Sequence, residues 1–340
     1  MLIVEKFEGT ATEIGRAHGR AFCHSIASNL SHFVEHPNDR WSHVEADAKA
    51  WFLKLRDRHF QQWPWLYDEM LGISEGANIS FDLIQQLNFR IWQYPFYGQS
   101  HACSSFVIIL SDGTIVAGGS LDDPRWAYGC VRIKPINGYE IITLPVCGTT
   151  WGNRGMNSTG LSLGVSSLPL KGFRADINSI WQQDICFRII LQTCASCQDV
   201  VEFCQKYPFF ANSMVVDKTG SYTALSCTPA ELKIHSPGVK CLTNHALEEH
   251  MECFRLKGWD GKIESDTSVA RLSLLRKWVE QKDHRVALSE VKKFICNRSE
   301  EQSSINNSLT AFMMFSIPAQ NKIWIADMPV TIEKLQVFNF

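Results

Sequence analysis

The sequence predicts an α+β protein in which antiparallel sheets pack against helices, and two features of its hydrophobic pattern carry that prediction. Residues 1–100 show mainly helical periodicity, whereas residues 104–166 are short apolar runs bounded by Gly, Asn or Pro. Further along the chain, helical and strand-like segments again come in blocks. Blocks of this kind favour antiparallel layers over repeated βαβ units.

The expected elements follow from periodicity and turn residues. Helices are expected at 12–30, 41–60, 178–194, 196–207, 267–281 and 287–296. Strands are expected at 104–110, 114–118, 131–134, 139–145, 160–166, 310–317 and 322–327, with a further hairpin at 214–227. No internal repeat or low-complexity linker is visible, so we expect one domain over 1–340.

Composition narrows the classes of function. The chain is 45% hydrophobic and carries a formal net charge of −2, without the basic excess that nucleic-acid or anionic-membrane partners need. Its apolar runs are too short to span a bilayer, and Glu5 and Lys6 interrupt the place of a signal-peptide core. We therefore expect a soluble, cytoplasmic protein with a small-molecule partner. The sequence leaves its oligomeric state open.

Twelve cysteines are spread along the chain, which argues against a disulfide scaffold. Cys194 and Cys197 have Cys-x-x-Cys spacing, but no second pair follows at zinc-ligand spacing. With Cys186 and Cys204 they lie in a helical pattern, near one face. Core packing is the expected role, and a metal or redox site is the alternative.

A polar, reactive cluster, His101-Ala102-Cys103-Ser104-Ser105, stands where the helical pattern changes to strands. Such a strand position usually holds Val, Ile or an aromatic residue. A lone Cys there is more often a core residue, so a catalytic interpretation of Cys103 needs partners.

Three other polar segments supply candidate partners. Asp122 ends the first hairpin, Asn244 and His245 follow a strand, and Arg271 lies one turn into a helix. An Asn amide can donate to an oxyanion, and Arg can bind a carboxylate. Turn formation is the plain alternative for Asp122 and for Asn244-His245.

Taken together, six segments make the chain resemble the isopenicillin N acyltransferase family of N-terminal-nucleophile (Ntn) hydrolases, and more distantly the choloylglycine hydrolases. The resemblance covers nearly the whole chain. The segments are Gly9-Thr10-Ala11-Thr12-Glu13-Ile14-Gly15 with Gly19, Cys103-Ser104-Ser105, the hairpin ending at Asp122, Gly155-Met156-Asn157-Ser158-Thr159-Gly160-Leu161, Thr243-Asn244-His245 and Ser268-x-x-Arg271.

The resemblance implies a four-layer αββα fold and a precursor that cuts itself before Cys103, giving fragments 1–102 and 103–340. The freed α-amino group, with an ordinary pKa of about 7.7–8.0, would act as general base. The Cys103 thiolate would then form a thioester acyl-enzyme that water or an amine resolves. No cofactor is implied, and an acyl-CoA or other acyl-thioester is a candidate substrate.

The same resemblance implies roles for the remaining site residues. Asn244 would hold the oxyanion, and Asp122 would orient the Cys103 amine or the substrate. Arg271 would support that network, and Ser105 would help the self-cleavage. If the chain stays intact, His101 or His245 would have to accept the thiol proton.

The chain departs from the family pattern at three positions. Ala102 stands where relatives mostly carry Gly, and its Cβ narrows the backbone freedom that self-cleavage uses. Gly119 stands where the choloylglycine relatives carry Arg. Those relatives also have a second oxyanion-contacting Asn near the position of Ser166, which this chain lacks. These departures weaken the expectation of bile-salt-type activity and of efficient processing.

The leading prediction is therefore a Cys103-dependent amide hydrolase or acyltransferase. The alternative within the same fold is an unprocessed or non-catalytic member that binds an acylated ligand.

Overall fold

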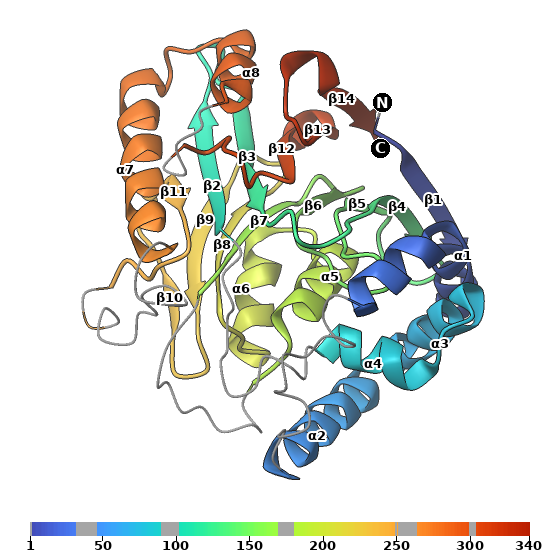
Figure 1. The fold of residues 1–340 in the computed structure, drawn as a ribbon. Helices are drawn as coiled ribbons and strands as arrows, with labels where there is room; N and C mark the ends of the chain where they lie inside the picture. The colour runs from blue at the N-terminus through green and yellow to red at the C-terminus, as the bar shows by residue number, and fades with distance from the viewer. Residues whose placement is uncertain are drawn as a thin grey trace.

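The computed structural model describes residues 2–31, 46–89, 102–168, 180–248, 250, 264–298 and 304–340. Two sheets form its centre (Figure 1). The first sheet has eight strands in the order β1-β4-β5-β6-β7-β8-β9-β10. Their bounds are β1 Val4–Gly9, β4 Cys130–Pro135, β5 Ile141–Thr143, β6 Gly155–Asn157, β7 Ser162–Ser167, β8 Ala211–Val216, β9 Tyr222–Cys227 and β10 Leu232–Ile234.

The second sheet has six strands in the order β11-β2-β3-β12-β13-β14, and all its pairs are antiparallel. Their bounds are β2 Ala102–Ile109, β3 Ile115–Asp122, β11 Cys241–Leu242, β12 Phe312–Ile317, β13 Lys322–Asp327 and β14 Gln336–Asn339. In the first sheet, β1 pairs with β4 in parallel.

Helices cover both outer faces. Helices α5 (Gln183–Thr193) and α6 (Cys197–Lys206) share a core with the eight-stranded sheet. Helices α7 (Glu264–Lys282) and α8 (Leu288–Cys296) share a second core with the six-stranded sheet. Two further apolar clusters fill the space between the sheets. The four-layer αββα fold that the family resemblance implied is thus confirmed, as Figure 1 shows.

Four more helices, α1 (Ala11–Leu30), α2 (Ala46–Gln62), α3 (Trp65–Ala77) and α4 (Phe81–Phe89), precede β2 and pack into the core around α5 and α6. A capping box between Thr10 and Glu13 precedes α1, which begins at Ala11, one residue before the expected start. Residues 1–100, which were expected to be mainly helical, also contain strand β1, which the periodicity of the sequence did not reveal.

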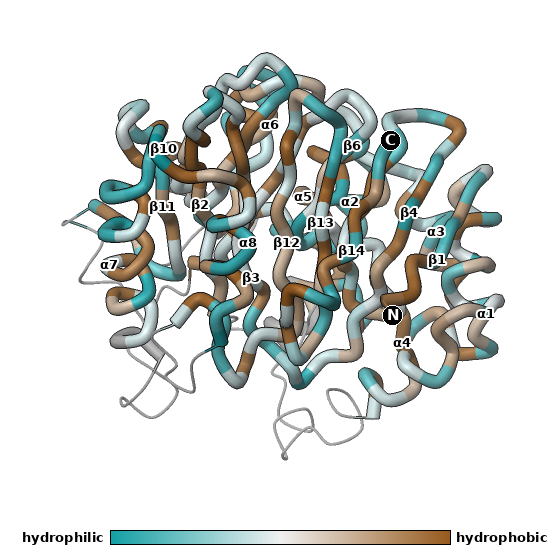
Figure 2. The backbone as a smooth tube through the Cα atoms, turned by 90° about the horizontal axis from the view of Figure 1, so that it is seen from above, coloured by the Kyte–Doolittle hydropathy of each residue, from teal (hydrophilic) through white to brown (hydrophobic). Residues whose placement is uncertain are grey.

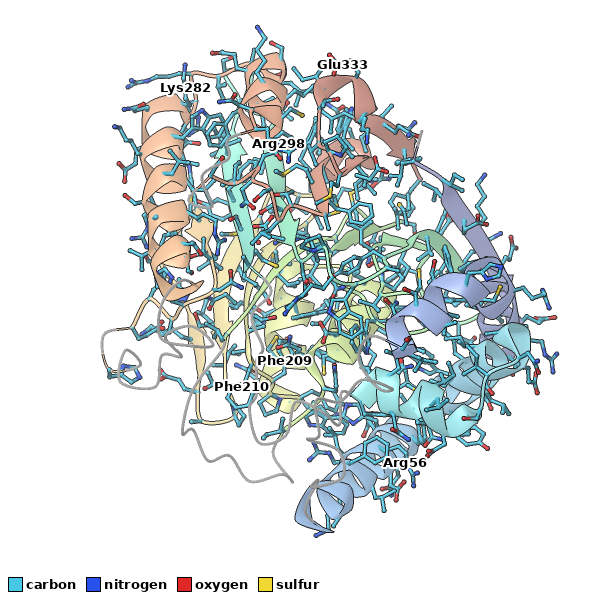
Figure 3. All side chains as sticks on the ribbon, in the orientation of Figure 1. Arg56, Phe209, Phe210, Lys282, Arg298 and Glu333 are labelled. Atoms are coloured by element: carbon cyan, nitrogen blue, oxygen red, sulfur yellow. The ribbon has the colours of Figure 1, made fainter. Side chains whose placement is uncertain are left out.

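Hydropathy follows this layering. In Figure 2 the central strands are mainly brown, and teal segments gather toward the periphery. Figure 3 shows Lys282 and Glu333 at the rim, whereas Phe209 and Phe210 lie inside, where both are buried. No helix in the described ranges is long and apolar enough to cross a membrane.

The cysteines expected to pack in the core do so. Cys186, Cys194, Cys197 and Cys204 all belong to the core cluster around α5 and α6. The two separate helices expected here are present, since α5 ends at Thr193 and α6 begins at Cys197. The four cysteines therefore lie on or beside two helices and not on one helix face. No cluster of metal-ligating side chains occurs among the residues with described positions.

Candidate active site

Cys103 is the second residue of β2 and is only 3% exposed. Side chains alternate between the two faces of a strand. Phe106 belongs to the core under α7 and α8, whereas Val107 belongs to a cluster between the sheets. Cys103 and Ser105 share the parity of Val107, so their side chains face the eight-stranded sheet.

Asn244 lies next to Cys103 because β11 pairs with β2, with Leu242 opposite Ser105. The Asn244 Oδ1 accepts from the Cys103 backbone N–H at 2.7 Å and from Arg271 Nη2 at 3.0 Å. Its Nδ2 donates to the Ser167 carbonyl oxygen at 3.2 Å. The two donors on Oδ1 fix the orientation of the amide group. Its carbonyl end therefore faces the Cys103 amide and its NH2 end faces β7.

Arg271 reaches the same point from α7 and is 1% exposed. Its Nη1 donates to the Cys103 carbonyl oxygen and, at 2.8 Å, to Ser104 Oγ. One turn earlier, Ser268 Oγ accepts from the Asn244 backbone N–H at 2.9 Å. Helix α7 therefore fixes both the start of β2 and the loop that carries Asn244.

Asp122 is the last residue of β3, lies opposite Ala102 in the strand register and is buried. Its carboxylate accepts from Ser120 Oγ at 3.0 Å and from Thr310 Oγ1 at 2.8 Å. Burial raises the pKa of Asp122 to about 6, although the Arg271 charge and both hydroxyl groups act in the opposite direction. This carboxyl group therefore changes its charge just below neutral pH.

Burial and several nearby charges shift the pKa of the Cys103 thiol. Burial raises its pKa, the Arg154 charge lowers it, the Asp122 charge raises it and the Arg271 charge lowers it again. Burial prevails, because removing a thiolate from water is costly. The charges of the two arginines nevertheless keep the pKa of the thiol lower than burial alone would make it.

The structure brings together four of the predicted residues: Cys103, Asn244, Asp122 and Arg271. The Asp122 carboxylate contacts two hydroxyl groups, and the backbone N–H of Cys103 contacts Asn244. The catalytic roles expected for these side chains stay predictions.

Ser105 and His245 lie at the edge of this group. Ser105 Oγ accepts from Arg154 Nη2 at 3.2 Å. His245 Nδ1 lies 2.8 Å from Ser268 Oγ, so it supports the loop around Asn244. His101 lies outside the described residues.

Sequence reasoning missed Arg154. This residue directly precedes β6 and is fully buried, yet its guanidinium group contacts Ser104 and Ser105. The available signal was an isolated Arg beside the Gly155–Leu161 motif. This signal could not indicate which residues Arg154 contacts, because the contact depends on how the two sheets face each other.

A cavity lies elsewhere in the structure. It has a volume of about 920 Å³ and is lined by the start of α1, by residues 135–139 and by Trp65, Glu69 and Arg188. None of the six predicted site residues lines it.

Two facing sheets between helical layers, with a buried Cys at the head of a central strand, define a protein of the Ntn-hydrolase fold. Residues 123–326 match the family described as acyl-coenzyme A:6-aminopenicillanic acid acyl-transferase. Because this match covers more than half of the chain, the chain belongs to that family. The matched segment includes Asn244 and Arg271 and begins one residue after Asp122.

Individual relatives are distant. A 40 kDa form of acyl-coenzyme A:6-aminopenicillanic-acid-acyltransferase from Emericella nidulans is 23% identical over 180 residues, which cover 49% of this chain and 47% of the relative. The match therefore spans about half the length of that relative.

Two solved structures are also similar. A mutant of the conjugated bile acid hydrolase from Clostridium perfringens matches with a TM-score of 0.50 at 13% identity, covering 70% of this chain and 92% of the other. Penicillin V acylase from Agrobacterium tumefaciens matches with a TM-score of 0.43 at 16% identity, covering 66% and 83%. The first likeness supports the fold alone.

Proposed function

We propose that the chain is a Cys-dependent acyltransferase or amide hydrolase in which Cys103 carries the acyl group as a thioester. Family membership supports acyl chemistry, and one structural observation supports this nucleophile. Cys103 is held at the head of a central strand by Asn244 and Arg271, which both contact its own backbone. Holding a nucleophile in place in this way supports catalysis by orientation.

The proposed reaction starts with self-cleavage. The Cys103 thiol attacks the Ala102 carbonyl carbon, the C–N bond breaks and the Cys103 nitrogen takes the thiol proton. Water then hydrolyses the thioester between Ala102 and Cys103, which gives fragments 1–102 and 103–340. The new α-amino group takes the thiol proton, and the thiolate attacks the carbonyl carbon of an amide or thioester. The C–N or C–S bond of the donor breaks, and the leaving amine or thiol takes the proton. Water or an amine then attacks the Cys103 thioester and restores the thiol.

The substrate belongs to one of two chemical classes within this proposal, an acylated amide or an acyl-thioester such as an acyl-CoA. Hydrolysis and transfer share the acyl-enzyme and differ only in the acceptor.

Mass spectrometry of the intact protein tests this proposal. Freshly purified wild type should contain fragments ending at Ala102 and beginning at Cys103. Exposure to an acyl-thioester should add the acyl mass to the fragment that begins at Cys103. Cys103→Ala should abolish cleavage, adduct and turnover with the fold intact. Cys130→Ala removes a different buried cysteine, 2% exposed, and should keep all three.

Full turnover in a folded Cys103→Ala protein would refute the nucleophile. The alternative function, an unprocessed member that binds an acylated ligand, is favoured by Ala102, whose Cβ hinders the bent peptide that cleavage needs. An intact chain that binds the probe reversibly, with no adduct, would establish that alternative.

A further inference from the structure

Arg154 crosses the space between the two sheets at the level of the Cys103 strand. Its side chain is 0% exposed. Its Nη2 donates to the Ser104 carbonyl oxygen of β2 at 2.9 Å and to the Val165 carbonyl oxygen of β7 at 2.7 Å. The guanidinium group therefore lies on the face of β2 toward which the Cys103 side chain points.

Two glycines leave room for this guanidinium group. Gly119 lies opposite Ser105 in the β2–β3 register. A Cβ added to Gly119 would lie 2.5 Å from Arg154 Nη1, and one added to Gly164 of β7 would lie 3.4 Å from it. A side chain at position 119 would thus compete with Arg154 for the same space. Strand β3 of the six-stranded sheet and strand β7 of the eight-stranded sheet consequently leave space for this cation, which comes from the start of β6.

Arg154 makes no direct ion pair with a carboxylate in the described part of the chain, and the Asp122 charge acts on it without a hydrogen bond. Its acceptors are two backbone carbonyl oxygens and the Ser105 hydroxyl group, all uncharged. Its Nε and Nη1 are buried and make no hydrogen bond to the described residues. A buried cation without a directly paired counter-ion is costly, because the charge loses its hydration. Such a cost is reasonable if an anion forms beside the cation during the reaction.

Cys103 is the group that becomes such an anion. Burial lowers the pKa of Arg154, whereas the Cys103 and Asp122 charges raise it. Arg271 approaches from the opposite face of β2 and contacts the Cys103 carbonyl oxygen instead. Of these two arginines, Arg154 is therefore the one on the side of the sulfur.

We propose that Arg154 is a further catalytic residue, which stabilises the Cys103 thiolate from the opposite sheet. This inference rests on the proposed function. The thiol proton passes to the α-amino nitrogen of Cys103, and the sulfur lone pair then forms the C–S bond of the thioester. The guanidinium group exchanges no proton and forms no covalent bond. It neutralises the charge on sulfur until the thioester forms.

A purely structural role is the competing explanation, because Arg154 Nη2 also links β2 to β7. The two explanations differ in what they expect of the thiol. A structural link affects the stability of the fold and the access to Cys103 at every pH. A thiolate partner changes the pH at which Cys103 becomes reactive. The other charges that act on this thiol are Asp122 of β3 and Arg271 of α7, and both stay unchanged in the experiment below.

The test measures the alkylation rate of Cys103 by iodoacetamide from pH 6 upward to the highest pH at which circular dichroism shows the fold intact, with the modified peptide quantified by mass spectrometry. Arg154→Gln removes the charge but keeps an amide donor for the Ser104 or Val165 carbonyl oxygen. We expect its Cys103 alkylation rate to fall tenfold or more at pH 7, with the midpoint raised by about one unit. The limiting rate at high pH should be unchanged. Arg154→Lys keeps the charge and should lose less than threefold.

Two controls accompany this comparison. Cys23 is partly exposed and serves as an internal reference, whose pH profile should be the same in all variants. The double variant Glu69→Gln/Arg188→Met removes another fully buried arginine together with its ion-pair partner. It should leave the Cys103 midpoint where the wild type has it.

An unchanged midpoint in Arg154→Gln, or an equal fall in rate at every pH, would overturn the proposal. If Arg154→Gln does not fold, Arg154→Met gives the same comparison, because apolar replacement of a buried charge is often tolerated. A shifted alkylation midpoint in a protein that forms no acyl adduct would refute the proposed function and leave the Arg154–thiolate pairing standing.

Discussion

Asp122 carries a buried carboxyl group whose pKa is raised to about 6. The ionised form is the one that can hold a protonated amine at Cys103, and it prevails above that pKa. Turnover of the wild type should therefore rise with pH around a midpoint near 6. Asp122→Asn keeps the size of the side chain but cannot ionise. We expect it to lose this acidic limb and to lower kcat about tenfold or more.

A pH–rate profile of both proteins, each checked by circular dichroism, measures this effect. An acidic limb that persists in a folded Asp122→Asn protein would assign the titration to another group.

Asn244 supports a second prediction about a single residue. The Asn244 Oδ1 accepts hydrogen bonds from the Cys103 N–H and from Arg271. Its Nδ2 donates to Ser167 of β7, which lies on the face of β2 toward which the Cys103 thiol points. If Nδ2 donates to the oxyanion, Asn244→Ala should lower kcat by about a hundredfold or more. Single-turnover kinetics would show the loss in the acylation step. A change of only a few-fold would leave Asn244 with the role of a loop anchor.

Residues were predictable from the sequence where a local motif marked them. Cys103 stands out because a reactive group occupies a strand position usually filled by apolar residues. Ser268 was part of a motif, but its contact with the Asn244 backbone required the packing of α7 against β11. Arg154 could not be found, since its partners Ser104 and Val165 belong to two different sheets.

The head of β2 carries the proposed cleavage point. Ala102 is the first residue of the strand and pairs with Asp122, so the Ala102–Cys103 peptide starts out extended. Attack of the thiol on the Ala102 carbonyl carbon requires that peptide to bend into a strained geometry. Glycine reaches such conformations at little steric cost.

Ala102→Gly should therefore speed cleavage relative to the wild type. A time course of fragment appearance at equal protein concentration measures the difference, and Cys103→Ala gives the zero-rate baseline. A wild type that is already fully cleaved on purification, with a variant that is no faster, would contradict the strain argument.

Elements with strong periodicity were predicted well, and short or edge strands were not. The β2–β3 hairpin follows from its apolar runs and from the turn at Gly113, where φ is +84°. Strand β1 escaped notice because it precedes a helix and pairs with β4, more than 120 residues away. Strands β6 and β10 have three residues each, which is too short for a period-2 pattern to be visible.

Across the whole molecule, buried polar contacts join the segment before residue 103 to the rest. Arg188 and Glu69 form a two-bonded ion pair at 3.0 and 3.1 Å, and each side chain is 1% exposed. His18 Nε2 accepts from the Gly148 N–H, and His59 Nε2 accepts from the Gln182 N–H. Strand β1 adds its pairing with β4. Fragments 1–102 and 103–340 should therefore remain associated after cleavage and separate only in denaturant.

The two histidines also make the stability of the whole molecule depend on pH. Burial lowers the pKa of both His18 and His59 to about 3. Between about pH 4 and 6 each therefore binds fewer protons when folded than when unfolded, and stability falls as the pH falls. Asp122 acts in the opposite sense over this range, because its folded pKa is raised. Burial also lowers the pKa of His235, which acts in the same direction as the other two histidines.

Each group that binds a different number of protons in the two states changes the slope of the unfolding free energy by up to about 1.4 kcal/mol per pH unit. His59→Gln retains an oxygen that can accept from the Gln182 N–H but removes one titrating group, so its unfolding free energy should fall less steeply from pH 6 to 4 than that of the wild type. Asp122→Asn removes the opposing group and should make the fall steeper than in the wild type. Urea unfolding at pH 4, 5 and 6, followed by circular dichroism, measures all three slopes. Equal slopes in the three proteins would show that other groups control acid stability, since only a change in proton uptake alters a slope.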